Sequence, residues 1–274
     1  MLSSPIPQER KFVHLILIHM RQSLPAIMAV GSLVLIWETY ARLSGISPTT
    51  LPAPSRVLGQ AFEYRQALFD NMLPTLRATL AGFACSLVAA FLLSVIVDFV
   101  APLKRALFPV FIISQTLPLV AIAPLVVLWF GFGLLPKILL VALVTFFPML
   151  VALTKGYEAT EDELQQLLTS MGAPRWKLFL MARLPSSLPF FFAGLRISIT
   201  YAVVGAIFAE YAGAAKGLGI YMLNAKNNFR PDLVLAAVLV SAVLTLLLFG
   251  ASVLAERLAM PWTRRGAGDG ARTR

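Results

Sequence analysis

The sequence predicts an all-α polytopic membrane protein with six transmembrane helices and both termini in the cytoplasm. The 274 residues are 58% hydrophobic and 13% charged, whereas soluble globular chains carry about 25% charged residues. The mean hydropathy is +0.81. This composition excludes a disordered chain, which needs low hydrophobicity, and the single cysteine excludes a disulfide scaffold. The 23 basic residues are scattered between apolar blocks, a pattern that argues against binding to nucleic acid.

The transmembrane helices are predicted from long apolar stretches. A helix needs about 20 mostly apolar residues to cross roughly 30 Å of hydrocarbon. The third stretch contains Pro109, Pro118 and Pro124, so we expect kinks there. Arg196 alone interrupts the charge-free run of the fifth. The expected spans, which make up a six-helix transmembrane domain at 24–256, are 24–42, 73–98, 106–130, 136–154, 188–210 and 233–256.

The orientation follows from the loop charges, because Lys and Arg accumulate on the cytoplasmic side. Both termini and the loops of one side carry about twice as many basic residues as the loops of the other. We therefore expect a cytoplasmic or interfacial segment at 1–23, lying along the inner membrane face, and a cytoplasmic basic tail at 257–274. A cleavable signal peptide is the alternative for the N-terminus, but no small-residue cleavage site follows the first apolar run.

Two external segments have distinct signals. The segment 43–72 begins with a Pro-rich turn, and from Ser55 it offers an N-cap followed by apolar residues at helical spacing, which predicts a short surface helix. The segment 211–232 contains Gly213, Gly217 and Gly219. Because glycine permits close turns, we expect a tight turn or a re-entrant piece there.

The cytoplasmic segment 155–187 is the longest interior loop. It has helical periodicity over 162–171, a break at Gly172-Ala173-Pro174, and a second helical stretch over 175–184 that ends at Pro185. Trp176 and Phe179 are expected to be exposed, and exposed aromatic residues near a break favour a protein interface, with the membrane surface as the alternative. An ordinary connector is the simplest interpretation of the loop, but connections are usually shorter.

The sequence offers no catalytic, metal or cofactor site. It lacks the G-x-x-x-x-G-K-[ST] phosphate loop, the G-x-S-x-G elbow and the H-E-x-x-H motif. Both histidines precede the first span, and the acidic residues near the membrane fall at span ends. A proton-coupled carrier usually needs an ionisable group in mid-membrane. We therefore expect a chain that is not an enzyme and that, if it transports, takes its energy from a partner.

Residues 166–185, QLLTSMGAPRWKLFLMARLP, resemble the coupling loop of binding-protein-dependent ABC importer permeases. That family has Glu-Ala-Ala, a Gly six residues after the Glu, and Leu-Pro ending thirteen residues after the Gly. Gly172 and Leu184-Pro185 match these spacings, whereas Gln166-Leu167-Leu168 replaces Glu-Ala-Ala. The resemblance implies that the loop docks into a cytoplasmic ATPase subunit. The residues it assigns to docking are Gln166, Leu167, Leu168, Gly172, Ala173, Trp176, Leu184 and Pro185.

The resemblance extends over most of the chain and is greatest to the nitrate/sulfonate/taurine-type permeases, which include permeases for thiamine-precursor pyrimidines. It implies a bacterial inner-membrane location, a second permease copy, a pair of ABC ATPase subunits, and a periplasmic or lipid-anchored solute-binding protein. An oxyanion such as a sulfonate, taurine or nitrate is the implied solute, and a pyrimidine vitamin precursor is the alternative. An ion-coupled carrier, a membrane scaffold and a membrane enzyme are the competing classes. The matching stretches are LPAPSRVL (51–58), TLRATLAGF (75–83), PLVAIAPLVVLWFGFG (118–133), GLRISIT (194–200), AEYAGAAKGLG (209–219) and LAMPW (258–262).

Four polar residues are candidates for the solute pathway or its gate. Arg196 could attract an anionic solute, because a buried arginine is costly, or it could bond to backbone carbonyls or a loop acid. Glu210 could pair with Arg42 or Lys216, or form part of an external gate. Gln115 and Thr116 could line the pathway or join helices.

Overall fold

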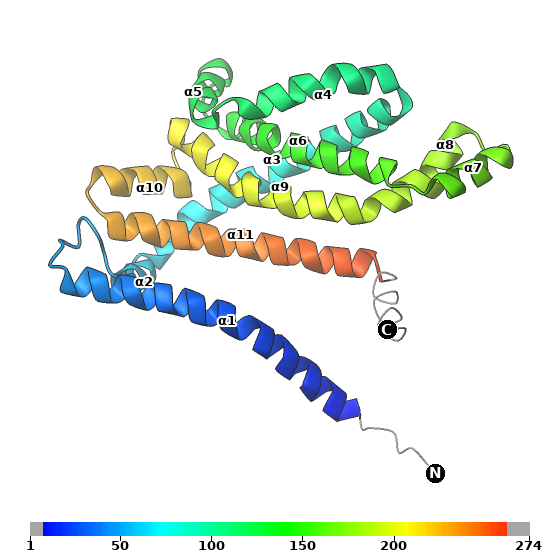
Figure 1. Cartoon of the computed structure of the whole chain (residues 1–274). Coiled ribbons are helices and arrows are strands. Elements are labelled where there is room, and N and C mark those ends of the chain that lie inside the picture. Colours follow the sequence, from blue (N-terminus) through cyan, green and yellow to red (C-terminus); the bar gives the residue numbers. More distant parts are fainter. Residues whose placement is uncertain (1–7, 262–274) are drawn as a thin grey trace, which may run out of the picture.

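The computed structural model describes residues 8–261, and the side chains of 24–261 except those of 26 and 101. In that part of the chain every regular element is a helix (Figure 1). The long helices lie along one another, with α7 and α8 at one end of the bundle and α2, α5 and α10 at the other. We call these the α7 end and the α10 end. The elements are α1 (Gln8–Leu43), α2 (Pro54–Glu63), α3 (Arg65–Phe99), α4 (Ala101–Thr116), α5 (Leu119–Phe130), α6 (Leu134–Glu158), α7 (Asp162–Ser170), α8 (Arg175–Leu178), the π-helical η1 (Phe179–Arg183), α9 (Leu184–Gly213), α10 (Leu218–Asn227) and α11 (Pro231–Ala259).

Four helices of the described chain are long and apolar enough to cross a membrane: α3, α6, α11 and the continuous helix Arg175–Gly213 that contains α9. The bent pair of α4 and α5 is a fifth candidate. The first expected span, 24–42, lies within α1, which is not among these helices, so a total of six stays a prediction. The cytoplasmic placement of the termini also stays a prediction. Residues 1–7 and 262–274, which hold part of the expected N-terminal segment, most of the basic tail and Trp262, lie outside the described residues.

The expected third span, 106–130, is broken rather than kinked. Helices α4 and α5 meet at an angle of 99°. The break lies at Leu117, which has an extended ψ of 128°, directly before Pro118. A proline disfavours the helical conformation of the preceding residue, which fits the break before Pro118, although Pro109 and Pro124 lie within helices.

The second helical stretch of the interior loop does not end at Pro185, as the sequence predicted. It continues from α8 through the π turn η1 into α9. Pro185 lacks the N–H that a regular α-helical hydrogen bond needs. The turn directly before it is wider than an α-helical turn, because the Leu184 N–H donates to the Phe179 carbonyl, five residues back. The loop is therefore joined rigidly to the membrane helix that follows it.

The predicted short helix after the Pro-rich turn is α2, but Ser55 is not its N-cap. Ala53 occupies that position and Pro54 opens the helix. The Glu38 carboxylate of α1 accepts hydrogen bonds from the Ser55 N–H at 2.9 Å and from its hydroxyl at 2.8 Å. A carboxylate at a helix N-terminus satisfies free N–H groups and complements the helix dipole. Glu38 thus replaces the expected cap from a different helix.

The core lies where α3, α6 and α9 pack together, and small residues bring these helices close. Ala78, Ala202 and Ala206 are buried around Val141 of α6. A Cβ at Gly82 would lie 2.6 Å from the Val141 Cβ, so only glycine fits at this crossing. Small residues at helix crossings are typical of membrane bundles, because association there depends on close packing.

Candidate functional site

The corner between α7 and α8 depends on Gly172. Its φ is +76°, a left-handed conformation that costs other residues roughly 1–2 kcal/mol. The Gly172 N–H donates to the Thr169 carbonyl at 2.9 Å, and the Ala173 N–H donates to the Leu168 carbonyl at 3.0 Å. These are the two bonds of a Schellman motif, which satisfies the last carbonyls of a helix. The chain turns at the break that the sequence predicted, and Pro174 then leads into α8 in an extended conformation.

The corner presents an exposed, partly apolar surface. Helix α7 buries none of its residues. Met171 is 74% exposed and Trp176 is 55% exposed, and Leu167 and Gln166 are exposed as well. The Lys177 ammonium lies 5.8 Å from the centroid of the Trp176 ring, within reach of a cation–π interaction. We call Gln166, Leu167, Met171 and Trp176 the loop surface; exposed apolar groups gathered in this way are typical of an interaction site.

The other residues assigned to docking are less accessible. Leu168, Ala173 and Leu184 are half-buried, whereas Pro185 is exposed. Phe179 was expected to be exposed and is buried instead. The continuous helix through η1 turns this side chain toward the membrane helices, where its ring lies 5.1 Å from that of Tyr157 and 5.5 Å from that of Phe99. Phe179 therefore anchors the loop to the bundle.

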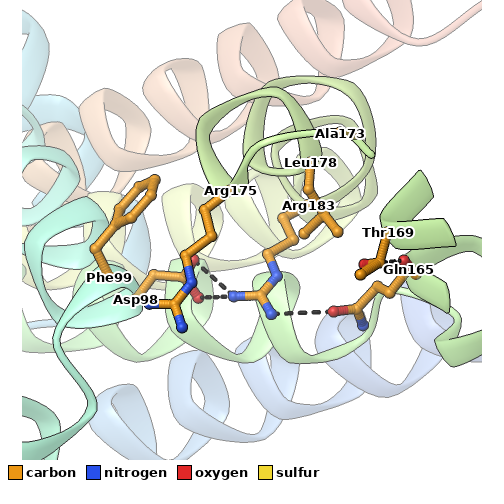
Figure 2. Close-up of a pocket in the computed structure, with 8 residues that line it drawn as sticks. All are labelled: Asp98, Phe99, Gln165, Thr169, Ala173, Arg175, Leu178 and Arg183. Atoms are coloured by element: carbon orange, nitrogen blue, oxygen red, sulfur yellow. Dashed lines mark hydrogen bonds and ion pairs between the residues drawn. The ribbon is translucent and has the colours of Figure 1, made fainter. Parts of the chain in front are cut away.

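A polar site beneath the loop was missed by the sequence analysis. The Arg183 guanidinium donates to both carboxylate oxygens of Asp98 at 2.8 Å and to the Gln165 side-chain oxygen at 3.0 Å. Figure 2 shows the guanidinium between these two partners. A cavity of about 440 Å³ adjoins them. The sequence shows Asp98 at the end of one span and Arg183 directly before Leu184-Pro185, but neither residue identifies the other as its partner.

Arg196 has an acidic partner within the chain. Its guanidinium donates to the Glu256 carboxylate of α11 at 2.6 Å. Both side chains are partly accessible, so the pair is a bridge between α9 and α11 rather than a sealed ion pair. Contact between Arg196 and a solute stays a prediction.

Glu210 lies fully buried near the α10 end. The expected pairing with Arg42 or Lys216 is wrong, because Arg42 bonds to Glu38. The Lys137 ammonium of α6 lies 3.6 Å from the Glu210 carboxylate. It also donates to the Lys216 carbonyl at 3.2 Å, so the backbone of Lys216, and not its charge, belongs to this cluster. The ion pair joins α6 to the end of α9.

The same carboxylate holds the glycine-rich connection before α10. It accepts hydrogen bonds from the Thr75 hydroxyl at 2.9 Å and from the Gly219 N–H at 2.8 Å. The Thr75 oxygen also accepts from the Leu218 N–H at 2.8 Å. Gly217 has a φ of +147°, and a Cβ there would overlap the Glu210 carboxylate. The connection is therefore the close turn that its glycines predicted, and α10 follows it.

A basic cavity opens beside this cluster. Its volume is about 550 Å³, and it lies between α3, the start of α6 and the end of α9. Arg77, Lys137 and Lys216 line it, with no acidic residue in its wall. In the described chain the Arg77 side chain makes no hydrogen bond or ion pair, so its charge is available to an anion. These three residues come from three separate segments, so no local sequence pattern groups them.

Gln115 and Thr116 lie at the end of α4, beside the break before α5, and both are exposed. The Thr116 hydroxyl donates to the Ile113 carbonyl at 2.7 Å, a bond within its own helix. The structure therefore does not bring them together with Arg196 and Glu210, which bond to partners on other helices. Their place along a solute pathway stays a prediction.

The charged groups at the α10 end form ion pairs rather than a metal site. Among the side chains that the structure describes, no three His, Cys, Asp or Glu residues lie close enough to hold a metal ion. Asp232 is buried and bonds to Arg230 at 3.0 Å and to Arg56 of α2 at 3.3 Å. The hydrogen bond from Arg230 to Asp232 holds the pKa of Arg230 above its ordinary value. These contacts fix α2 to the start of α11.

Comparison with known proteins gives consistent relatives. A family model described as binding-protein-dependent transport system inner membrane component matches residues 82–259. The chain is 34% identical over 245 residues to the formylaminopyrimidine transport permease protein ThiX of Halalkalibacterium halodurans, covering 89% of this chain and 98% of that protein. It is 35% identical over 232 residues to the riboflavin transport system permease protein RibX of Chloroflexus aurantiacus, covering 84% and 87%. It is 32% identical over 250 residues to the taurine transport system permease protein TauC of Escherichia coli, covering 88% and 90%.

One solved structure supports the fold. A chain of the MetNI methionine ABC transporter, described in inward-facing conformations, is similar to this chain with a TM-score of 0.58 and 18% identity. The match covers 70% of this chain and 94% of that chain. At this identity the likeness concerns the arrangement of helices only.

Proposed function

This chain belongs to the binding-protein-dependent transport system inner membrane components, the permease subunits of ABC importers, and we propose that it transports an oxyanion. The proposed solute is a sulfonate, taurine or nitrate, and two copies of the chain form its pathway. The proposed partners are a pair of cytoplasmic ABC ATPase subunits and a periplasmic or lipid-anchored solute-binding protein. The proposed location is a bacterial inner membrane with both termini and the α7 end in the cytoplasm, as the loop charges predict.

The loop surface supports the proposed docking to an ATPase subunit. The Schellman corner at Gly172 fixes the angle between α7 and α8, and it leaves Met171 and Trp176 accessible at the tip of the bundle. Leu167 stands where the family has Ala, so the contact is bulkier, and Gln166 lacks the charge of the usual Glu. In the proposed cycle, ATP binding draws the two loops together and opens the pathway outward, and hydrolysis resets it.

The basic cavity at the α10 end is the observation that favours an anionic solute. Arg77, Lys137 and Lys216 line it without an acidic residue, and a cleft lined by one sign of charge raises the local concentration of ions of the opposite sign. The Lys137 charge is partly balanced by Glu210, so Arg77 carries most of the argument. The alternative role for Arg77 is a side chain that snorkels to the membrane surface, and oxyanion uptake by Arg77→Gln separates the two roles.

A pyrimidine vitamin precursor is the second candidate. The similarity to ThiX, whose name specifies formylaminopyrimidine, extends over 98% of that protein. The basic cavity offers a neutral heterocycle no charge to pair with, which is why the oxyanion takes precedence.

Two experiments test the proposal. The first is affinity purification of the tagged chain from native membranes. We expect a subunit with a Walker motif to copurify in stoichiometric amount with the parent chain and to be absent from the Gly172→Asp preparation. Purification of the chain alone, under conditions in which other importers stay intact, would favour a carrier or a scaffold.

The second experiment measures uptake of labelled taurine, methanesulfonate, nitrate and formylaminopyrimidine in cells with and without the chain. Uptake of formylaminopyrimidine but of no anion would overturn the oxyanion assignment.

A further inference from the structure

A single side chain of α7 connects this helix of the coupling loop to the rest of the bundle. Within the described residues, Gln165 is the one side chain of α7 that hydrogen-bonds outside its own helix. Its amide nitrogen donates to the Thr160 carbonyl at 3.1 Å, and its oxygen accepts from Arg183 at 3.0 Å. The remaining α7 residues are exposed except for the half-buried Leu168, so packing does little to hold the helix in place. A movement of α7 must therefore act on Arg183.

Arg183 owes its position to the π turn. It is the last residue of η1 (Phe179–Arg183), and single π turns within helices are frequent at functional sites. From there the guanidinium bonds to both Asp98 oxygens, and a planar guanidinium matches a carboxylate in this two-bond geometry better than a lysine can. The Arg183 Nε is buried without a hydrogen-bond partner. It is a spare donor that a second arrangement of the loop can use.

Asp98 lies one residue before the end of α3, which is a continuous helix from Arg65 to Phe99. Near the other end of that helix, Thr75 bonds to Glu210 and to the Leu218 N–H. Asp98 and Thr75 are 23 positions apart in α3, which corresponds to about 35 Å of helix and is roughly the thickness of a membrane. One helix thus connects the polar site under the loop with the buried cluster at the α10 end.

We propose that Arg183 is the positioning residue that transmits the movement of α7 to α3, by holding Gln165 of the loop and Asp98 of α3 at once. The inference rests on the proposed docking of the loop surface to an ATPase subunit. Without this link, α7 still reaches the ATPase, but its movement passes only into α6 and α9, to which the loop is joined covalently. With the link, α3 moves as well and carries the displacement to Thr75 and the basic cavity.

The test uses single-thiol reporters in the purified complex of permease and ATPase. The one cysteine is removed as Cys85→Ala. Glu163→Cys in exposed α7 then reports docking, and Phe69→Cys, exposed at the α10 end of α3, reports movement of that helix. The rate of labelling of the tagged chain by a water-soluble maleimide is compared without nucleotide and after trapping with ATP and vanadate. We expect trapping to change the labelling rate at Phe69→Cys when the link is intact.

Asp98→Asn, Arg183→Lys and Gln165→Ala each weaken the link, and Arg175→Lys is the matched control. Arg175 lines the same cavity, but its side chain makes no hydrogen bond or ion pair in the described chain. We expect each link variant to keep its bound ATPase and its slow maleimide labelling at Glu163→Cys. We expect the change in labelling rate on trapping at Phe69→Cys to become smaller by about fivefold or more. Gln165→Ala leaves the ion pair intact, so it serves if the charge variants fail to reach the membrane.

The outcomes separate this inference from the proposed function. Loss of the ATPase from the parent chain itself would overturn the docking. An unchanged response at Phe69→Cys in Asp98→Asn or Gln165→Ala, with docking retained, would overturn the link alone. An equal loss in Arg175→Lys would also overturn it, because that result would assign the effect to the cavity as a whole.

Discussion

Removal of the Lys137 charge tests the buried cluster at the α10 end most sharply. In Lys137→Met the Glu210 carboxylate, fully buried and 3.6 Å from the ammonium, loses its counter-charge. Breaking a buried ion pair by removing one partner costs about 3–5 kcal/mol. Thr75 and Gly219 still donate to Glu210, so we expect the lower end of this range. Glu210→Gln should cost less, about 1–2 kcal/mol, because Lys137 keeps its bond to the Lys216 carbonyl and faces the cavity.

The double variant decides whether the pair is the cause. Lys137→Met combined with Glu210→Gln has no unpaired buried charge, so it should be more stable than Lys137→Met alone despite the additional substitution. Lys216→Met is the matched control. Only the backbone of Lys216 contacts the cluster, and a surface substitution of this kind usually changes stability by less than about 0.5 kcal/mol.

The assay is thermal unfolding of the purified chain in detergent, with all variants compared at one scan rate because such unfolding is often irreversible. A loss of 1 kcal/mol lowers the midpoint by roughly 2–4 °C in a chain of this size class. We therefore expect a drop of roughly 6–12 °C for Lys137→Met, with partial recovery in the double variant. A double variant that melts at or below Lys137→Met would refute the assigned ion pair.

Three further predictions follow from single positions. Gly172→Ala places a Cβ on a left-handed residue at a cost of about 1 kcal/mol, and we expect less ATPase to copurify, whereas Gly59→Ala, which meets nothing within 4 Å, should have no effect. Phe229 has a φ of 54° and is 79% exposed, so Phe229→Gly should relieve about 1 kcal/mol of strain and raise the melting midpoint; an unchanged or lower midpoint would contradict this. Arg77→Gln should reduce oxyanion uptake without lowering the amount of protein in the membrane, and undiminished uptake would place Arg77 in the snorkelling role.

The sequence determined what depends on local chemistry. Apolar length and composition predicted the helical membrane class and the approximate positions of the spans that the structure supports. Glycine and proline predicted the corner at Gly172 and the turn at Gly217, because only glycine adopts these backbone conformations without strain. Proline also predicted irregularity in the third span, although its extent, a 99° break at Pro118, follows from the packing of both halves against other helices.

The tertiary structure alone decided which distant polar groups meet. Asp98 and Arg183 are 85 residues apart in sequence, and Thr75 and Glu210 are 135 residues apart, so no local pattern pairs them. The burial of Phe179 likewise depends on the π turn, which rotates the helix against its neighbours. Helical periodicity and turn chemistry act over a few residues, whereas an ion pair forms only where helix packing brings its partners within a few ångströms of each other. For that reason the class and the loop are readable from the sequence, and the links between the two ends of the bundle are not.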